Sequence, residues 1–417
     1  LYDFENRRRI FPGIDSRIKF ALVTLTGAEQ PAEAATFVFF AHHPDDVLDD
    51  DRRFTLSRED IALLNPNTRT CPTFRSKRDA EITKGIYRRV PVLINEQNGE
   101  NPWAIRLTTM FNMSNDSGLF RTRDDLEGEG YGLDGNVFVR GAEKFLPLYE
   151  AKLFHQFDHR FATYEPDGTR DTTLAEHEDP TCEPMPRYWV HRSETDERLV
   201  RRARDGTIDW QWREPWFLVF RDITRSTDKR TAIYTVIPRA AVGNKAPILF
   251  LDRPSVESGL MLVAAANSFA LDYVARQSIG GSNCNFFILK QLPFPAPAMF
   301  TEAQREFVTT RTAELIATSN AMATALGYPA PFTWDPSRRD YLRAELDAFL
   351  FDAYGIPRED AAFILDTFPI VKRRDEEQYG HYRTKDTILA IYDEMAQCRN
   401  AGRPYTSPLN PPPGHMP

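Results

Sequence analysis

The chain has 417 residues, of which 41% are hydrophobic, 27% charged and 12% aromatic. This composition is typical of a folded protein with room for two or three domains of roughly 150 residues, and it excludes a disordered chain. The formal net charge of -8 excludes a uniformly basic nucleic-acid-binding protein but leaves room for a locally basic face.

The cysteines and the apolar runs exclude further classes of protein. The four cysteines lie far apart without a CxxC pair, which argues against a disulfide scaffold or a zinc ribbon and predicts a reducing cytoplasm. The longest apolar run, residues 260–270, falls short of the ~18 residues that a membrane span needs. The chain begins with Leu1 and shows no signal peptide, so we expect a piece of a longer protein.

The first ninety residues combine strands with a basic segment. Runs rich in Val, Phe and Thr predict strands at 18–24 and 36–41. Ser57-Arg-Glu-Asp is typical of a capping box and predicts a helix over 58–64. Seven Arg or Lys residues then face two acidic residues over 67–89, which gives this segment a charge of +5.

The middle of the chain is predicted to be rich in strands. Leu133-Asp-Gly-Asn indicates a hairpin turn, the polar stretch 165–183 a mobile loop, and the apolar spacing of 260–276 a buried helix. We expect strands at 103–110, 137–140, 187–191, 216–223, 232–237 and 285–289.

The chain changes character after Pro293, where apolar residues recur at helical spacing. This pattern predicts helices over 301–326, 337–354, 357–367 and 383–397, with a disordered Pro-rich tail over 400–417. The fold class that follows is α+β, a β-rich domain followed by a helical C-terminal domain.

Several enzyme motifs are missing from the sequence. There is no Walker loop, no Gly-x-Ser-x-Gly elbow, and no glycine loop on a strand-to-helix turn that would hold a dinucleotide or a methyl donor. His42-His43 and the pair His155 and His159 contain metal-ligand types, but we favour hydrogen-bonded structural histidines and expect no metal site. Asp134, Glu150 and Lys152 have the spacing of a Mg²⁺ nuclease, which we keep as an alternative.

Several long segments resemble the C-terminal half of large adenine-specific DNA methylases. These are the single-chain type IIG and IIL restriction–modification enzymes and their relatives in DISARM- and BREX-type phage-defence islands. The segments are LYDFENRRRIFPGIDSRIKFALVTL, FTLSREDIALLNPNTRTCPTFRSKRDAEITKGIYRRVPVL, FLPLYEAKLFHQFDHRFATYE, IGGSNCNFFILKQLPFP and ILDTFPIVKRRDEEQYGHYRTKDTILAIYDEM.

The resemblance implies a division into parts. Residues 1–41 would be the last strands of a truncated methyltransferase sheet, 42–297 a target-recognition domain that binds DNA, and 298–399 a helical domain. In that family an upstream domain binds S-adenosylmethionine and holds the flipped adenine with an Asn-Pro-Pro-aromatic motif. Here Asn65-Pro-Asn and Asn410-Pro-Pro-Pro do not match that motif. We therefore expect no catalytic and no cofactor-binding residue in this chain, and S-adenosylmethionine as the cofactor of the intact enzyme.

Duplex DNA is the partner that the resemblance implies, together with other restriction or defence-system subunits and no membrane. DNA recognition requires cations for phosphates and planar or hydrogen-bonding side chains for base edges. We predict that DNA contacts come from the basic segment, the 155–160 segment, the strand-like run before Pro293 and the basic-aromatic stretch 372–385, which we expect to be a loop. The residues are Arg69, Arg75, Lys77, Arg78, Lys84, Gln156, His159, Arg160, Lys290, Lys372, Arg373, Arg374, Tyr379 and Arg383.

Two further features have two interpretations each. Trp210, Trp212 and Trp216 could form a stacking platform or the buried face of a strand. The glycine-containing run 278–285 could approach a phosphate or could only connect two elements. A second hypothesis for the whole chain is a protein-interaction module that docks a methylase to other defence subunits.

Overall fold

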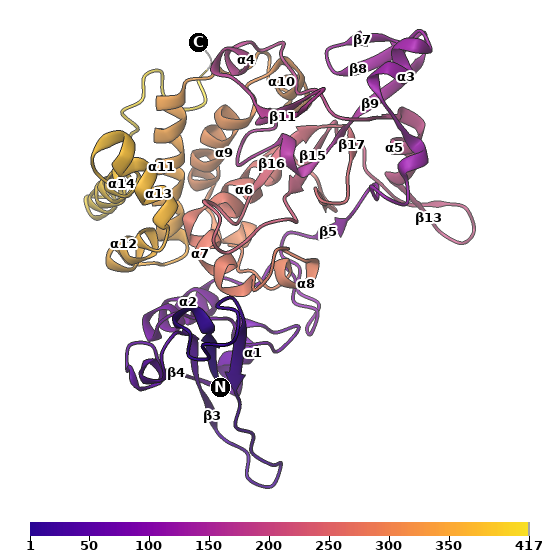
Figure 1. Cartoon of the computed structure of the whole chain (residues 1–417). Helices are drawn as coiled ribbons and strands as arrows, with labels where there is room; N and C mark the ends of the chain where they lie inside the picture. Colours follow the sequence, from indigo (N-terminus) through magenta and orange to yellow (C-terminus); the bar gives the residue numbers. More distant parts are fainter. Residues whose placement is uncertain (416–417) are drawn as a thin grey trace.

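The computed structural model describes residues 1–415 and has a mixed α+β architecture, as predicted (Figure 1). β-Sheets occupy the first 251 residues and helices α6–α14 follow them. The largest hydrophobic cluster includes buried residues from Phe37 to Ile391, so the strand-rich and helical regions share one core.

The first region is a four-stranded sheet in the order β2-β1-β3-β4. β1 pairs in parallel with β3 and antiparallel with β2, while β4 pairs with β3, so the sheet continues past residue 41. The predicted helix after Ser57 is confirmed with its capping box, which Ser57 and Asp60 form. The elements are β1 Tyr2–Glu5, β2 Lys19–Leu22, β3 Ala34–Ala41, β4 Phe54–Ser57, α1 Arg58–Leu64 and α2 Lys77–Arg89, with 3-10 turns η1 Asn6–Arg8 and η2 Pro44–Leu48.

The segment between β2 and β3 is an extended, exposed connection that projects from the sheet (Figure 1). It carries Val23 and Leu25, and the Leu25 side chain is 85% exposed. β2 is therefore an edge strand whose neighbouring loop presents apolar side chains to solvent.

The middle region contains two larger sheets. One has six strands, in the order β6-β12-β9-β8-β7 with β17 paired to β9, and the other four, in the order β16-β15-β18-β5. The strands are β5 Ile105–Thr108, β6 Phe120–Arg121, β7 Gly132–Asp134, β8 Val137–Arg140, β9 Glu143–Tyr149, β12 Trp189–His191, β15 Trp216–Phe220, β16 Tyr234–Pro238, β17 Ala241–Val242 and β18 Ile248–Leu251.

Two isolated hairpins and three short helices complete this region. The stretch 165–183, predicted as a mobile loop, instead contains a strand and a helix, because the strand pairs with its neighbour through the backbone and a Thr173–Glu176 capping box starts the helix. The elements are hairpins β10 Ala162–Glu165 with β11 Gly168–Asp171 and β13 Val200–Arg202 with β14 Ile208–Gln211, helices α3 Arg123–Gly128, α4 Leu174–Glu178 and α5 Arg192–Arg198, and 3-10 turns η3 Ser117–Leu119 and η4 Ala151–Leu153.

The apolar segment predicted as one helix forms two, α6 Val256–Asn267 and α7 Phe269–Ser278, because Ser268 caps the second and breaks the first. α6 packs between β16 and α9, and Gly259 lets it approach the Trp216 ring. No single described helix is long and apolar enough to cross a membrane; α6 and α7 meet those criteria only together, across a 62° bend.

The helical region follows, with the C-terminal helices together at one side of the molecule (Figure 1). The strand predicted at 285–289 is wrong, because Asn285 precedes a short helix there. A four-residue apolar run is compatible with either a strand or a helix, so the sequence pattern does not distinguish them. The elements are α8 Phe286–Leu289, η5 Pro297–Met299, α9 Glu302–Ile316, α10 Asn320–Leu326, α11 Pro336–Ala353, α12 Arg358–Asp366, α13 Pro369–Tyr379 and α14 Arg383–Asn400.

The Pro-rich tail is not detached from the fold over its described part. Tyr405 and Leu409 pack against the core, and the Tyr405 hydroxyl donates to Glu345 at 2.8 Å. The described part of the tail predicted to be disordered therefore contacts the helices at Tyr405 and Leu409. Residues 416–417 lie outside the described part of the chain.

Candidate nucleic-acid interface

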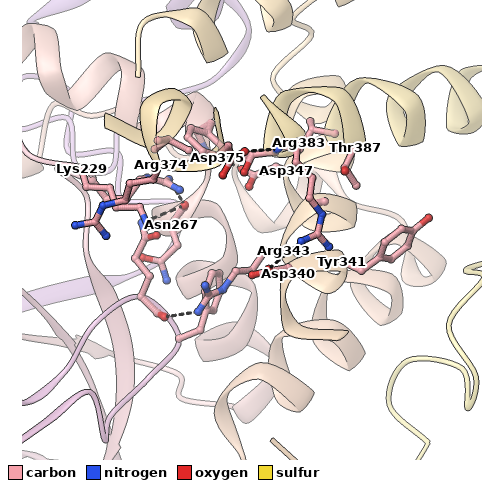
Figure 2. A pocket seen from close by; sticks show the side chains of 18 of the residues that line it. Lys229, Asn267, Asp340, Tyr341, Arg343, Asp347, Arg374, Asp375, Arg383 and Thr387 are labelled. Carbon is pink, nitrogen blue, oxygen red and sulfur yellow. Dashed lines mark hydrogen bonds and ion pairs between the residues drawn. The ribbon is translucent and has the colours of Figure 1, made fainter. Parts of the chain in front are cut away.

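A cavity of about 460 Å³ opens between the β-rich region and the C-terminal helices (Figure 2). Its wall is made by the turn at 155–157, the segment before β16, the start of α7, and parts of α11, α13 and α14. The volume lies within the range of small-molecule sites, roughly 300–1,000 Å³. Because distant segments supply the wall, the cavity exists only in the folded chain.

Positive charge predominates in this cavity. Arg230 is paired with Asp272, which is not part of the wall, and Arg383 has its nearest carboxylate, Asp340, at 4.0 Å. Within residues 1–415, no carboxylate oxygen lies within 4.0 Å of the other three cations. The charged lining residues are Lys229, Arg230, Arg343, Arg374 and Arg383 against Asp340, Asp347 and Asp375.

Arg343, on α11, is the least compensated of these cations. Its Nη2 donates to the Gln156 carbonyl at 3.3 Å, while its buried Nε has no hydrogen-bond partner among residues 1–415. Burial lowers the pKa of Arg343, although Asp340 works against this shift. A partly enclosed guanidinium without an anionic partner is costly, so this position favours an anion from outside the chain.

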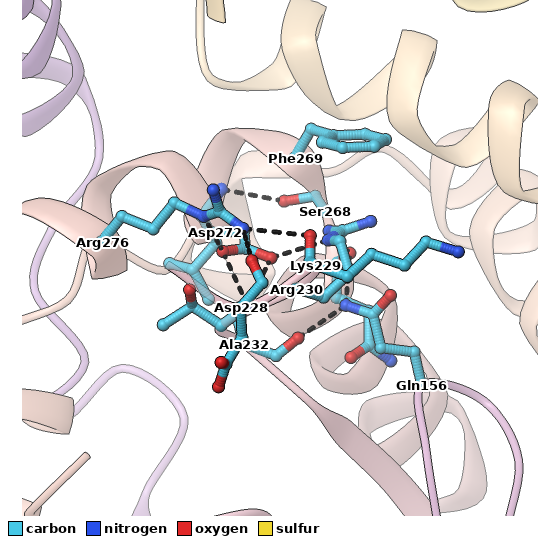
Figure 3. A network of polar contacts seen from close by, with 12 residues as sticks. Gln156, Asp228, Lys229, Arg230, Ala232, Ser268, Phe269, Asp272 and Arg276 are labelled. Atoms are coloured by element: carbon cyan, nitrogen blue, oxygen red, sulfur yellow. Dashed lines mark hydrogen bonds and ion pairs between the residues drawn. The ribbon is translucent and has the colours of Figure 1, made fainter. Parts of the chain in front are cut away.

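A buried ionic network fixes the segment that carries Lys229 (Figure 3). The fully buried Asp272 accepts from Arg230 Nε at 2.6 Å and Arg276 Nε at 3.1 Å, and from the Thr231 backbone amide. Arg276 Nη2 in turn donates to the Lys229 carbonyl at 3.0 Å. The backbone of Lys229 is therefore held in place while its side chain stays free of ion pairs.

The pKa of Lys229 is affected by the other cations that line the cavity. Partial desolvation by the cavity wall lowers the pKa of Lys229, and the like charges of Arg374, Arg343 and Arg230 lower it further. His155 also lies in the wall, where burial, then Arg221 and Arg343, lower its pKa to about 3. The imidazole is therefore neutral at pH 7.

Two of the three acidic groups in the wall accept hydrogen bonds from backbone amides, and the third, Asp340, lies 4.0 Å from Arg383. Asp347 is buried and accepts from the Phe269 amide at 2.8 Å; burial raises its pKa to about 6. Asp375 accepts from the Thr384 amide at 2.5 Å. With these carboxylates engaged by backbone amides, Lys229, Arg343 and Arg374 keep their charge for a ligand.

Four of the predicted DNA-binding residues meet at this cavity: Gln156, Arg374, Tyr379 and Arg383. Arg374 is exposed, and the Arg383 guanidinium lies 4.6 Å from the centre of the Tyr379 ring. Gln156 has a different role from the predicted one, because its buried amide donates to the Ala232 and Asn267 carbonyls.

His159 and Arg160 do not face a duplex, and the prediction is wrong for them. Each side chain is about 1% exposed. His159 lies 3.2 Å from both Glu183 and Ser319, while Arg160 donates to the carbonyls of residues 176, 177, 179, 182 and 318. The tight turn at 155–158 directs both residues into the interior, which spacing alone does not reveal.

The basic segment divides into exposed and engaged cations. Arg69, Arg75 and Lys77 are exposed, and Arg75 lies over the Phe40 ring. Arg78 instead pairs with Asp360 at 2.9 Å, which joins α2 to α12.

Lys84 and Lys290 are both taken up by acids of this chain. Lys84 is buried 2.8 Å from Glu81, so its prediction as a DNA contact is corrected: the buried face of α2 encloses it. Lys290 lies 2.5 Å from Glu96.

The basic stretch predicted as a loop is helix α13, with Pro369 in its first turn. Lys372 and Arg373 are exposed on it, with Glu376 and Glu377 one turn away at 4.0 and 3.8 Å. Because these pairs are long and solvent-exposed, they hold the cations weakly. α13 therefore carries three consecutive exposed cations, of which Arg374 lies in the cavity wall.

Two central cavity residues, Lys229 and Arg343, were not predicted from the sequence. Arg343 lies within Arg338-Arg-Asp-Tyr-Leu-Arg, where a predicted amphipathic helix carries an arginine beside its apolar face. That position was the available signal. Lys229 has no local signal, because the Asp272 network that orients its segment comes from α7.

The remaining candidates have structural roles. Trp212 and Trp216 are about 1% exposed and Trp210 packs on Phe250, so the buried-face interpretation is right and the stacking platform is wrong. The run 278–285 connects α7 to α8, and its Ser282 and Cys284 bond the backbone at 222–224.

The residues of the metal and nuclease alternatives have other partners. Glu150 accepts from the Tyr164 hydroxyl at 2.8 Å, and the Lys152 ammonium lies 5.1 Å from the Tyr164 ring centre. Over residues 1–415 there is no group of three or more His, Cys, Asp or Glu side chains that could hold a metal ion.

Comparison with known proteins gives no match for this chain, whether with protein-family models, curated proteins or solved structures.

Proposed function

We propose that this chain binds double-stranded DNA, as the target-recognition part of a S-adenosylmethionine-dependent, adenine-specific DNA methyltransferase of a restriction–modification or phage-defence system. The observation that supports it most is the set of cations without ion-pair partners at one concave surface: Lys229, Arg343 and Arg374. The sequence resemblance supplies the class of enzyme, and the cation set supplies the binding surface.

The physical basis is electrostatic. DNA presents a line of phosphates, and each Lys or Arg that neutralises one releases a condensed counterion. On a chain with net charge -8, acidic surroundings repel DNA, so an unmatched basic concavity also orients the duplex. Lys372 and Arg373 add two exposed cations next to Arg374 on α13. Arg383 and Tyr379, at the rim, have the fork and the ring that base recognition uses.

Methyl transfer is not assigned to this chain. Its sequence contains neither a glycine-containing cofactor loop nor an Asn-Pro-Pro-aromatic motif, so its residues do not fit a S-adenosylmethionine site. We expect the isolated chain to bind DNA without transferring a methyl group. Incorporation of tritiated methyl groups into duplex DNA by the isolated chain would contradict this assignment.

The binding test is fluorescence anisotropy with a labelled 30-base-pair duplex at several salt concentrations. We expect affinity to fall steeply between ~50 and 200 mM salt. The double variant Lys229→Gln, Arg374→Gln should bind at least about tenfold more weakly, with a salt slope reduced by about two, the number of phosphate contacts removed.

The matched control is the double variant Arg358→Gln, Lys385→Gln, which also removes two cations from the helical region. Arg358 pairs with Asp393 at 2.7 Å and Lys385 with Asp366 at 2.6 Å. The charge of each is already balanced by a carboxylate, so we expect neither to bind a phosphate. Its affinity should stay within about twofold of the unmodified chain. Equal losses in both double variants would show that only net charge matters and would reject the cavity as the DNA-binding surface.

A further inference from the structure

We propose that the cavity between the segment before β16, α11 and α13–α14 is a nucleotide-binding site that holds the phosphate group of its ligand with Arg343, Lys229 and Arg374. This goes beyond duplex binding and does not depend on it, because a free nucleotide carries an anionic phosphate next to a base, as a nucleotide within DNA also does.

The phosphate end of the site is defined by the cations. Arg343 offers a guanidinium whose Nε has no partner, and Lys229 and Arg374 have no carboxylate within 4.0 Å in the described chain. A phosphate dianion satisfies several such donors at once, with charge-assisted hydrogen bonds. Of the acids in the wall, Asp347 and Asp375 each accept a backbone amide, and Asp340 lies 4.0 Å from Arg383.

The remainder of the wall suits a nucleoside. The volume of the cavity, about 460 Å³, exceeds what a phosphate alone fills, and Tyr341 and Tyr379 are among the residues that line it. Aromatic rings stack on bases of any sequence. Gln378 and Thr387 add side-chain hydrogen-bonding groups.

The site is built before any ligand arrives. The Asp272 network holds the Lys229 backbone (Figure 3), and the Gln156 carbonyl holds one end of the Arg343 guanidinium. The Arg343 guanidinium and the Lys229 backbone therefore need little ordering on binding, so less affinity is lost to conformational entropy.

The experiment is isothermal titration calorimetry of the whole chain with three probes: inorganic phosphate, each of the four ribonucleoside 5′-monophosphates, and adenosine. We expect at least one monophosphate to bind more tightly than inorganic phosphate, and adenosine to bind at least about tenfold more weakly than its monophosphate. Arg343→Gln and, separately, Lys229→Gln should weaken monophosphate binding about tenfold, as loss of a charged hydrogen bond predicts.

The control Arg358→Gln removes a paired cation outside the cavity and should leave monophosphate binding unchanged. Lys229→Gln, at an exposed side chain, keeps the test informative if Arg343→Gln lowers stability. Absence of monophosphate binding in the unmodified chain, or binding by both cavity variants that is as tight as in the unmodified chain, would overturn the inference.

Competition with duplex DNA separates the two sources of the phosphate. Displacement of the duplex by a bound monophosphate would identify a nucleotide of DNA as the occupant, whereas simultaneous binding would identify a free nucleotide, and both outcomes support the site. Duplex binding without any monophosphate binding would reject the site and leave the proposed function standing. Monophosphate binding without duplex binding would support the nucleotide site and reject the proposed function.

Discussion

Arg160 shows how a residue selected as a DNA contact can be a structural one. Its guanidinium replaces the water that the carbonyls of residues 176–182 and 318 would otherwise need. Five N–H donors in a rigid fork suit this task, and no other side chain offers them. The same chemistry that makes arginine a candidate for phosphate binding makes it a candidate for this internal role, and burial decides between the two.

We predict that Arg160→Met lowers the free energy of unfolding by about 2–4 kcal/mol, because buried carbonyls lose their donors while the side-chain volume is kept. Urea denaturation measures the loss, and amide hydrogen exchange should show faster exchange in 174–182. Arg170→Met, which removes ion pairs with Glu165 and Glu176 at the surface, should cost far less. Equal effects of the two substitutions would contradict the internal role.

Asp347 gives stability a distinctive dependence on pH. Burial raises its pKa to about 6 from an ordinary value of 3.8, so the folded chain binds the proton more tightly than the unfolded chain does. The contribution of this group to the free energy of unfolding therefore falls as pH rises from about 4 to about 6, by up to about 3 kcal/mol.

We predict that Asp347→Asn removes this contribution and makes the protein more stable than the unmodified chain at pH 7.5, since the amide can still accept from Phe269. Urea unfolding at pH 4.5 and 7.5 measures the difference between the two chains. A difference that is the same at both pH values would show that Asp347 titrates normally.

At the scale of elements, two helical glycines illustrate when a small side chain is required. A Cβ on Gly259 would lie 3.1 Å from the Trp216 ring, so α6 approaches β15 only because glycine is there. A Cβ on Gly85, within α2, would meet no atom within 4 Å. Helical propensity favours alanine over glycine by roughly 1 kcal/mol at both positions, so packing alone separates them.

We predict that Gly85→Ala stabilises the protein by about 0.5–1 kcal/mol, whereas Gly259→Leu destabilises it by about 1–3 kcal/mol because the side chain overpacks the core. Thermal unfolding followed by circular dichroism measures both. Stabilisation by both substitutions would contradict the close packing of α6 on Trp216.

The C-terminal tail acts as a further element of the helical region. Glu345 is fully buried and pairs with Arg311 at 2.8 Å, and the Tyr405 hydroxyl supplies its other oxygen with a donor. Burial, together with the nearby Glu345 carboxylate, raises the pKa of Tyr405, so the phenol stays protonated and donates.

We predict that Tyr405→Phe lowers the free energy of unfolding by about 1–2 kcal/mol, since it leaves a buried carboxylate oxygen without its donor. Equilibrium denaturation measures the change. Tyr392→Phe, which removes a hydroxyl bonded to the Ile356 carbonyl, is a comparison in which no carboxylate is affected and a smaller loss is expected. An unchanged midpoint for Tyr405→Phe would mean that the tail contributes nothing.

At the scale of the molecule, the fold class and most C-terminal helices could be predicted, because helical periodicity and caps are local. The capping box at Ser57 and the hairpin at Leu133 are of this kind. Helix α13 was missed because its cations and acids mask the period, with Val371 as its single buried residue.

The cavity could be predicted only in part, for a different reason. Arg374 and Arg383 belong to a stretch where basic and aromatic residues alternate, which is a visible signal. Lys229 and Arg343 come from a loop and a helix more than a hundred residues apart, and only tertiary packing brings them together. Burial of His159 and Arg160 depends equally on long-range contacts, with Ser319 and Thr318.

The sheet order at the N-terminal end has a consequence for how the chain responds to a protease. β1 is the inner strand, paired on one side with β2 and on the other with β3, while the connection 23–33 is exposed and carries Leu25. Exposed connections are where cleavage concentrates. β1 is hydrogen-bonded to β3 whether or not that connection is intact. A cut there therefore leaves the first residues, about 20, paired in the sheet. The nicked protein would therefore migrate as one species under native conditions and as two under denaturing ones.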